Sequence, residues 1–225
     1  MRSNYLGILT SIKKDIDEVT SESRKDISLI VVTKSQSIEN ISKVLNAGNK
    51  HFGENYVEEA VKKIEHFNNN SIQWHYIGKI QSNKIKKISK YFDWVQTIAS
   101  IKHAKLLNKA CDDISKKMNI CIQVNIDREE SKSGVFIEDL DDFIENILVL
   151  DKLVLRGLMA LPSKINVLKE NINSYKILRS EYDRLKNKYK HIDTLSIGMS
   201  NDYKIAMDNG SNMIRIGTLI FGERK

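Results

Sequence analysis

Eight short apolar runs recur along this chain of 225 residues, and stretches with helical spacing of apolar residues separate them. Runs of this length predict buried strands, and their alternation with helices predicts βαβ crossovers in a parallel sheet. Eight such units favour closure into a single TIM-type (β/α)8 barrel. An open doubly wound sheet is the alternative, because periodicity does not report closure. The predicted strands are Ser28–Thr33, Lys50–Gly53, Ile72–Ile77, Asp93–Ile98, Ile120–Ile126, Leu153–Met159, Asp193–Ile197 and Met213–Ile216.

The stretches between these runs predict amphipathic helices, for example over Ile38–Ala47, and the longest is expected over Val167–Tyr189. An additional helix over residues 3–19 precedes the first strand. No linker, low-complexity segment or block of like charge divides the sequence. We therefore expect residues 1–225 to form one barrel domain with that N-terminal helix in front of it.

Composition and charge exclude several classes of protein. No run of 18 apolar residues is present, which argues against a membrane partner. Residues 1–5 lack the apolar region of an export signal, so a cytoplasmic location is expected. The net charge is +7, but the lysines are interleaved with Asp and Glu, so we expect no nucleic-acid partner. The densest basic stretch, Asn83–Lys90, predicts a helix with Ile85 and Ile88 facing inward; an anion site is the alternative.

The two cysteines, Cys111 and Cys121, lie ten positions apart, with no CxxC pattern and no His at ligand spacing. This pattern is typical of buried or half-buried thiols in a reducing cytosol. We predict no metal site.

Lys34 follows the first apolar run directly. In a barrel of this type, the active site lies at the carboxyl ends of the strands. Desolvation there lowers the pKa of a lysine and leaves a neutral amine that can attack an aldehyde to form a Schiff base. The alternative is a lysine that simply reaches the rim of the sheet.

Two segments near the end of the chain carry the signs of a phosphate site. Gly198–Asp202 follows the seventh run and leads into a short helix over Tyr203–Asn209, for which Ser200 or Asn201 is the predicted N-cap. Gly217-Thr218 follows the eighth run, where a residue without Cβ lets the backbone approach a ligand. Loops after strands seven and eight recur as the phosphate site of this fold. A helix cap and a turn are the alternative reading.

Arg215 lies inside the last apolar run, on the same face as Met213 and Gly217. Because an arginine cannot lose its proton, one inside a barrel must face an acceptor. A pyridine nitrogen is one such acceptor, and a buried carboxylate is the structural alternative.

Taken together, the motifs resemble the pyridoxal phosphate homeostasis protein family (YggS/PROSC type) from the first strand to the C-terminus. Each motif is weak alone, whereas eight in the family's order are specific. The motifs are Val31–Lys34, Phe52–Tyr56, Trp74–Gly78, Gln81–Lys84, Ser131–Gly134, Arg156–Met159, Leu195–Ser200 and Arg215–Thr218.

The resemblance implies a fold-type III barrel similar to the N-terminal domain of bacterial alanine racemase, with pyridoxal 5′-phosphate (PLP) as cofactor. It implies that Lys34 forms the internal aldimine and that Arg215 faces the pyridine nitrogen. The resemblance also implies that the phosphate is held by Ser200, Gly217 and Thr218. The residues that would line the ring pocket are Asn55, His75, Ile77 and Met199.

The expected function is that of a vitamin B6 homeostasis protein, a PLP carrier without catalytic residues. A cation beside the pyridine nitrogen keeps it unprotonated, which makes the ring a poorer electron sink. Racemases of this fold type add a β-domain after the barrel, and we expect no C-terminal β-domain here, because the sequence ends soon after Thr218. A monomer is therefore expected, with apo-enzymes as candidate recipients of the cofactor.

Two other functions remain open from the sequence. One is a fold-type III PLP enzyme, such as an amino-acid racemase, with Tyr56 or His75 as a candidate second base beside Lys34. The other is a barrel that uses Lys34 as a Schiff-base lysine toward sugar phosphates, without a cofactor.

Overall fold

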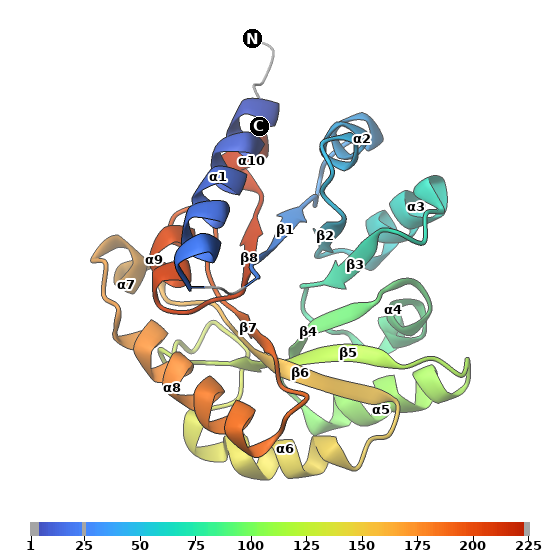
Figure 1. Ribbon diagram of the computed structural model, residues 1–225. Helices are drawn as coiled ribbons and strands as arrows, with labels where there is room; N and C mark the ends of the chain where they lie inside the picture. Colours follow the sequence, from blue (N-terminus) through green and yellow to red (C-terminus); the bar gives the residue numbers. More distant parts are fainter. Residues whose placement is uncertain (1–4, 24–25, 223–225) are drawn as a thin grey trace.

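The computed structural model describes residues 5–23 and 26–222. Within these residues, eight parallel strands pair in chain order and form a closed barrel (Figure 1). Ser28 to Val31 of the first strand pair with Met213 to Ile216 of the last, which closes the sheet. The predicted barrel is thereby confirmed and the open sheet is excluded. The strands are β1 (Ser28–Val32), β2 (His51–Glu54), β3 (Gln73–Tyr76), β4 (Trp94–Ile98), β5 (Met118–Val124), β6 (Leu153–Ala160), β7 (Thr194–Ser196) and β8 (Met213–Ile216).

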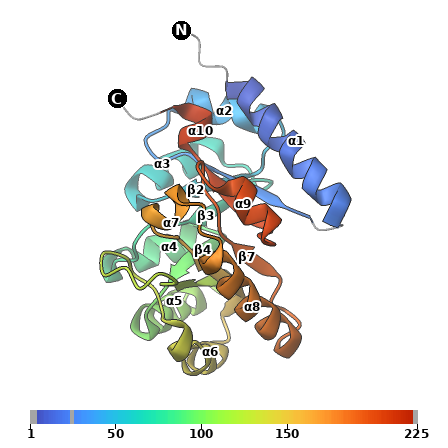
Figure 2. The same ribbon diagram turned by 90° about the vertical axis from the view of Figure 1, so that its left-hand side faces the viewer.

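Helices cover the outside of the barrel, as the alternating pattern predicts. The N-terminal helix α1 (Tyr5–Ser23) extends beyond the predicted end at residue 19, and residues 3 and 4 lie outside the described residues. It lies alongside α2, α9 and α10 (Figure 2). The other helical segments are α2 (Ile38–Asn46), α3 (Val57–Phe67), η1 (Ser82–Lys84), α4 (Ile85–Tyr91), α5 (Ile101–Asp112), η2 (Ile137–Asp139), α6 (Leu140–Leu148), α7 (Lys164–Leu168), α8 (Asn173–Lys188), α9 (Tyr203–Asp208) and α10 (Thr218–Phe221).

The long helix predicted over Val167–Tyr189 is wrong, because the structure divides this segment into α7 and α8. Ser163 caps α7 by accepting the N–H of Asn166, so that helix starts before the predicted one. Glu170 then adopts a left-handed conformation (φ 50°), and the side chain of Asn171 accepts the N–H of Asn173 at 3.1 Å. Such a local turn competes with helix propagation.

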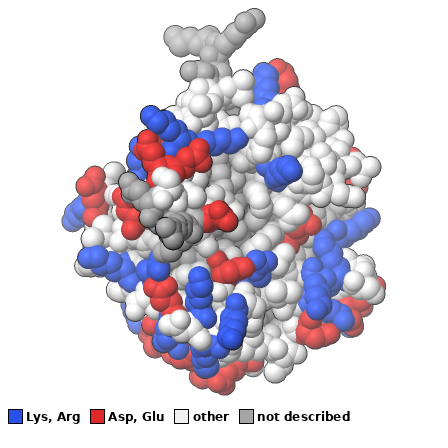
Figure 3. Space-filling model, in the orientation of Figure 1, with Lys and Arg blue, Asp and Glu red and all other residues white. Residues whose placement is uncertain are grey.

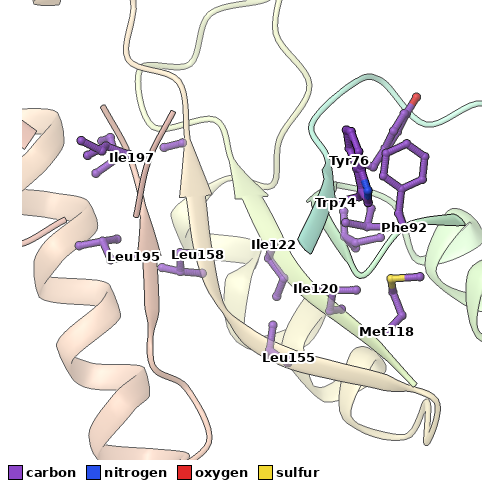
Figure 4. Close-up of a cluster of buried hydrophobic side chains, with 14 of the residues drawn as sticks. Trp74, Tyr76, Phe92, Met118, Ile120, Ile122, Leu155, Leu158, Leu195 and Ile197 are labelled. Carbon is purple, nitrogen blue, oxygen red and sulfur yellow. The ribbon is translucent and has the colours of Figure 1, made fainter. Parts of the chain in front are cut away.

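The main apolar core lies between the sheet and the helices. Figure 4 shows part of this layer, with side chains from β3, β5, β6 and β7, and Phe92 beside those of β3. Ile120, Leu158 and Leu195 are each at most 1% exposed. Burial of this outward face fixes which residues of each strand point into the barrel, because successive side chains alternate.

The barrel interior is divided into an apolar and a polar part. A separate apolar cluster consists of Ile30, Trp94, Cys121, Met159 and Met213. Buried polar side chains of β3, β4, β7 and β8 lie beside it. Cys111 and Cys121 are both buried free thiols, as expected.

The basic stretch forms η1 and α4, with Ile85 and Ile88 buried as predicted. Two of its lysines, Lys84 and Lys87, pair with Glu58 of α3 at 2.5 and 2.6 Å. Charges of both signs are interspersed over the face shown in Figure 3. The stretch is therefore a solvated helix face.

In the described part of the chain, no helix combines the length and the apolar character that crossing a bilayer requires.

Candidate functional site

Lys34 lies in a tight turn immediately after β1. Thr33, fully buried, continues the sheet by donating its N–H to Gly53 O at 2.9 Å. The chain then turns at Lys34 and Ser35, and the N–H of Gln36 donates back to Thr33 O at 3.0 Å. Lys34 is half-buried, and Ser35 has a left-handed backbone (φ 62°). The predicted lysine therefore stands at the carboxyl end of the barrel.

Asn55 and Ile77 follow the next two strands and reach the same end of the barrel. A Cβ at Gly78 would lie 2.1 Å from Asn55 O, so only glycine permits this approach of the two loops. The side-chain oxygen Oδ1 of Asn55 is buried and has no hydrogen-bond partner. Ile77 is half-buried, and its Cδ1 would lie 3.1 Å from a Cβ at Gly53. The buried Oδ1 of Asn55 costs free energy unless a ligand or water donates a hydrogen bond to it.

The loops after β7 and β8 are joined by Ser200. Its hydroxyl accepts the N–H of Leu219, in the first turn of α10, at 3.1 Å. Met199 and Thr218 flank this contact, and both side chains are exposed. The structure therefore brings together the two segments from which the sequence predicts a phosphate site.

The predicted N-cap of α9 is wrong, because Asp202 holds that position instead of Ser200 or Asn201. The Asp202 carboxylate accepts the N–H of Met199 and the hydroxyl of Tyr175, each at 2.7 Å. Asp202 is buried, and the carboxylate secures the loop from beneath. Ser200 is consequently available to α10.

Gly217 connects this region to the Lys34 strand. A Cβ at Gly217 would lie 3.1 Å from both the Cβ and the carbonyl oxygen of Val32, two residues before Lys34. The loops after β1, β7 and β8 therefore border one area at the carboxyl end of the barrel.

Arg215 lies inside the barrel and is 4% exposed. It donates to Ser196 Oγ at 2.5 Å and to Ala160 O at 2.9 Å. No ion pair among the described residues includes Arg215, so the buried carboxylate considered from the sequence is not its partner. Burial lowers the pKa of Arg215 to about 10, which still leaves it charged at neutral pH. A cation held by two neutral acceptors retains N–H groups for a further acceptor.

His75 is fully buried and belongs to a chain of hydrogen bonds that leads to Arg215. Its Nε2 is 3.0 Å from His51 Nδ1, its Nδ1 is 3.0 Å from Gln96 Nε2, and its ring stacks on Trp94. Ser196 then bridges Gln96 and Arg215, donating to Gln96 Oε1 at 2.7 Å. Burial holds the pKa of His75 well below its usual range, so the ring is neutral.

Gln96 and Ser196 were missed by the sequence interpretation, although a signal was present. Each is a polar residue at an inward position of a predicted buried strand, two residues after Trp94 and Thr194 respectively. The structure shows that they connect β3 to β8.

A cavity of about 490 Å³ opens at the other end of the barrel. Its lining includes Ser28, His51, Trp94, Thr194 and Met213, the first residues of their strands. An Arg156–Asp193 ion pair also lines it. It is thus separate from the Lys34 region. Within the described residues, no group of three or more His, Cys, Asp or Glu side chains is arranged to hold a metal ion.

Comparison with known proteins agrees with this geometry. Residues 9–225 match the family described as alanine racemase, N-terminal domain. The pyridoxal phosphate homeostasis protein of Buchnera aphidicola is 43% identical over 221 residues, which is 96% of this chain and 98% of that protein. This chain belongs to the same family. The corresponding Escherichia coli K12 protein is 40% identical over 208 residues, 90% of this chain and 88% of that one.

A solved structure of a family relative extends the comparison to the fold. PipY of Synechococcus elongatus, solved with PLP bound, aligns with a TM-score of 0.85 at 28% identity. The alignment covers 97% of this chain and 100% of PipY. The family relationship therefore spans the whole barrel, including the loops around Lys34.

Proposed function

We propose that this chain binds PLP at the carboxyl end of its barrel, with the cofactor attached to Lys34 as a Schiff base, and acts as a carrier of it without amino-acid turnover. The observation that carries the proposal is the meeting of three loops at that end. Lys34 follows β1, Gly217 lies against Val32 of that strand, and Ser200 ties the loop after β7 to α10. The PLP-bound state of PipY and the names of the curated relatives support the choice of cofactor.

The residues present fit PLP at three points. Arg215 has neutral partners and retains N–H groups for the pyridine nitrogen. The orphaned Oδ1 of Asn55 would gain a partner from a bound ligand. The Ser200 hydroxyl and the Gly217-Thr218 segment would hold the phosphate, with Ile77 and Met199 as neighbours of the ring. PLP would supply an aldehyde for the amine of Lys34, and their condensation would release the carbonyl oxygen as a water molecule.

His75 has a different relation to this site from the other predicted pocket residues. It is 0% exposed, and both ring nitrogens already have hydrogen-bond partners. We propose that it supports the site from within the barrel by holding Gln96, which in turn holds Ser196. Direct contact of His75 with the ring remains a prediction.

The absence of turnover is also part of the proposal. The Arg215 cation would disfavour protonation of the pyridine nitrogen and so weaken the ring as an electron sink. Of the two candidate second bases, His75 has its ring nitrogens engaged, and Tyr56 is 55% exposed at the start of α3. A racemase needs bases on opposite faces of the ring, so an amino-acid racemase is the less favoured alternative.

The proposal is tested by a visible spectrum before and after borohydride reduction. The modified lysine is then mapped. We expect an absorbance band from added PLP that reduction bleaches, with the label on Lys34. A label on another lysine would contradict the assignment. No band at all would favour a Schiff-base lysine that acts on sugar phosphates instead.

We further propose that the protein is a cytoplasmic monomer that passes PLP to apo-enzymes. Mixing the PLP-loaded protein with an apo-enzyme tests the transfer, and activity should return faster than with an equal concentration of free PLP. Light scattering at several concentrations tests the monomer, because a mass that rises with concentration contradicts it.

A further inference from the structure

Lys63 of α3 is a buried cation placed directly beneath the turn that carries Lys34. It is 4% exposed, and its Nζ donates to Glu54 Oε1 at 2.7 Å, to Glu59 Oε1 at 2.5 Å and to Thr33 O at 2.6 Å. A lysine ammonium has three donors, so these contacts use all of them. Lys63 therefore connects the ends of β1 and β2 to α3.

Glu59 completes the connection on the other side of Lys34. The same carboxylate oxygen that binds Lys63 accepts the N–H of Ser35 at 2.6 Å. Lys63 therefore holds the carbonyl of the residue before Lys34, and Glu59 holds the N–H of the residue after it. These two groups belong to the two peptide units that flank the Cα of Lys34. Holding both planes fixes φ and ψ of Lys34, and with them the direction of its Cα–Cβ bond, from which the side chain extends.

The turn requires such support. Ser35 has φ 62°, a left-handed conformation that is unfavourable for a residue with a Cβ and persists only when the surroundings enforce it. Glu54 is 0% exposed and also accepts the Thr33 hydroxyl at 2.6 Å, which fixes the residue before the turn a second time. The buried ion cluster therefore does more than attach α3 to the barrel, because it bonds the backbone on both sides of Lys34.

We propose that Lys63 and Glu59 are positioning residues that aim the Lys34 amine at the cofactor aldehyde. The inference rests on the proposed role of Lys34 and adds how that role is achieved. When the peptide units are released, the amine spends less time within reach of the aldehyde carbon. Formation of the C=N bond, with loss of water, then slows, while the contacts that hold the phosphate stay in place.

Glu59→Ala and Glu58→Ala form a matched pair for the test. Both residues lie in the first turn of α3, and each carboxylate binds a lysine ammonium. Glu58 bonds Lys84 and Lys87, away from the Lys34 turn. Stopped-flow absorbance with PLP gives the rate of Schiff-base formation. We expect Glu59→Ala to slow it by about tenfold or more, in line with the sensitivity of such reactions to misplacement, and Glu58→Ala to leave it unchanged.

Glu59→Gln is the conservative variant, because the amide oxygen of the glutamine can still accept the Ser35 N–H. It should restore part of the rate that Glu59→Ala loses. Lys63→Met should slow the reaction as well, and circular dichroism establishes whether each variant is folded. If Lys63→Met does not fold, the three Glu variants decide the matter alone.

Equal rates for Glu59→Ala and Glu58→Ala, with wild-type label mapped to Lys34, would overturn the positioning role and leave the proposed function intact. Failure of wild-type protein to trap PLP on Lys34 would instead overturn the proposed function. The two failures are therefore distinguishable.

Discussion

The two sides of the candidate site are built by different interactions. On the side of β1 and β2, a buried ion cluster around Lys63 holds the turn at Lys34. On the side of β7 and β8, hydroxyl and backbone groups meet, as in the contact of Ser200 with Leu219 N–H. In the proposed function, the first arrangement directs Lys34 toward its covalent bond with PLP. The second would present hydrogen-bonding groups to the phosphate, as proposed above.

A separate chain of hydrogen bonds crosses the inside of the barrel. It runs from His51 of β2 through His75, Gln96 and Ser196 to Arg215 of β8. Its four members after His51 are buried, so they hold one another firmly in place. The comparison of the two sides therefore predicts that changes on the β1–β2 side reduce Schiff-base formation, whereas changes on the β7–β8 side reduce PLP affinity.

The largest expected effect is that of Lys34→Ala. We expect complete loss of the visible Schiff-base band with the fold retained, because the change removes an amine and not core packing. PLP should still bind through the β7–β8 side, measurable by equilibrium dialysis. Circular dichroism gives the control for folding, and a band that survives the substitution would contradict the division between the two sides.

Gly217→Val should cause the largest loss of PLP affinity among changes on the β7–β8 side. A Cβ added there would lie 3.1 Å from Val32, so a branched side chain would displace either β1 or the phosphate of bound PLP. PLP titration followed by absorbance gives the dissociation constant, and thermal melting of the protein without PLP reports damage to the barrel. Unchanged affinity would remove Gly217 from the site.

Ser200→Ala should weaken PLP binding by roughly 1–3 kcal/mol, the usual cost of losing a hydrogen bond to a charged group. Ser100→Ala is the matched control, since Ser100 stands before α5 at the same end of the barrel and makes no side-chain cap bond. The same titration applies to both variants. Equal dissociation constants for them would place the phosphate elsewhere.

Burial of His75 in this hydrogen-bond chain predicts a smaller, pH-dependent effect on the stability of the protein. Its pKa lies well below 6.5 in the folded protein, whereas the unfolded chain takes up a proton near its ordinary value. The free energy of unfolding should therefore be fully retained above about pH 6.5 and fall on acidification, by up to about 1.4 kcal/mol per pH unit. Urea denaturation at several pH values should show a shallower decline for His75→Gln. Parallel declines would exclude the linkage.

Turnover of amino acids by the unmodified, PLP-loaded protein should be too slow to measure. We expect negligible racemisation of alanine, because Arg215 in its proposed place would disfavour protonation of the ring and His75 is engaged within the barrel. NMR in deuterated water with excess L- or D-alanine follows proton exchange at Cα. Turnover in the usual range of enzymes, roughly 1–1000 per second, would replace the carrier by a racemase.

The sequence alone determined the barrel, its eight strands and the loops from which Lys34, Ser200 and Gly217-Thr218 come. Apolar runs and helical spacing carry that information because burial acts locally on each strand and helix. The order of motifs also indicated the family. The missed break between α7 and α8 depends on a local turn that apolar spacing does not record.

Only the tertiary structure decided which polar residues support those loops. Along the sequence, Lys63 and Glu59 have the spacing of an ordinary exposed helix pair. Closure of the barrel places that pair beneath the Lys34 turn, where the carbonyl of Thr33 and the N–H of Ser35 become its partners. Asp202, at the N-cap of α9, likewise has a partner far away in the sequence, because Tyr175 donates to its carboxylate. Contacts of this kind join residues that are distant along the chain, so no local pattern predicts them.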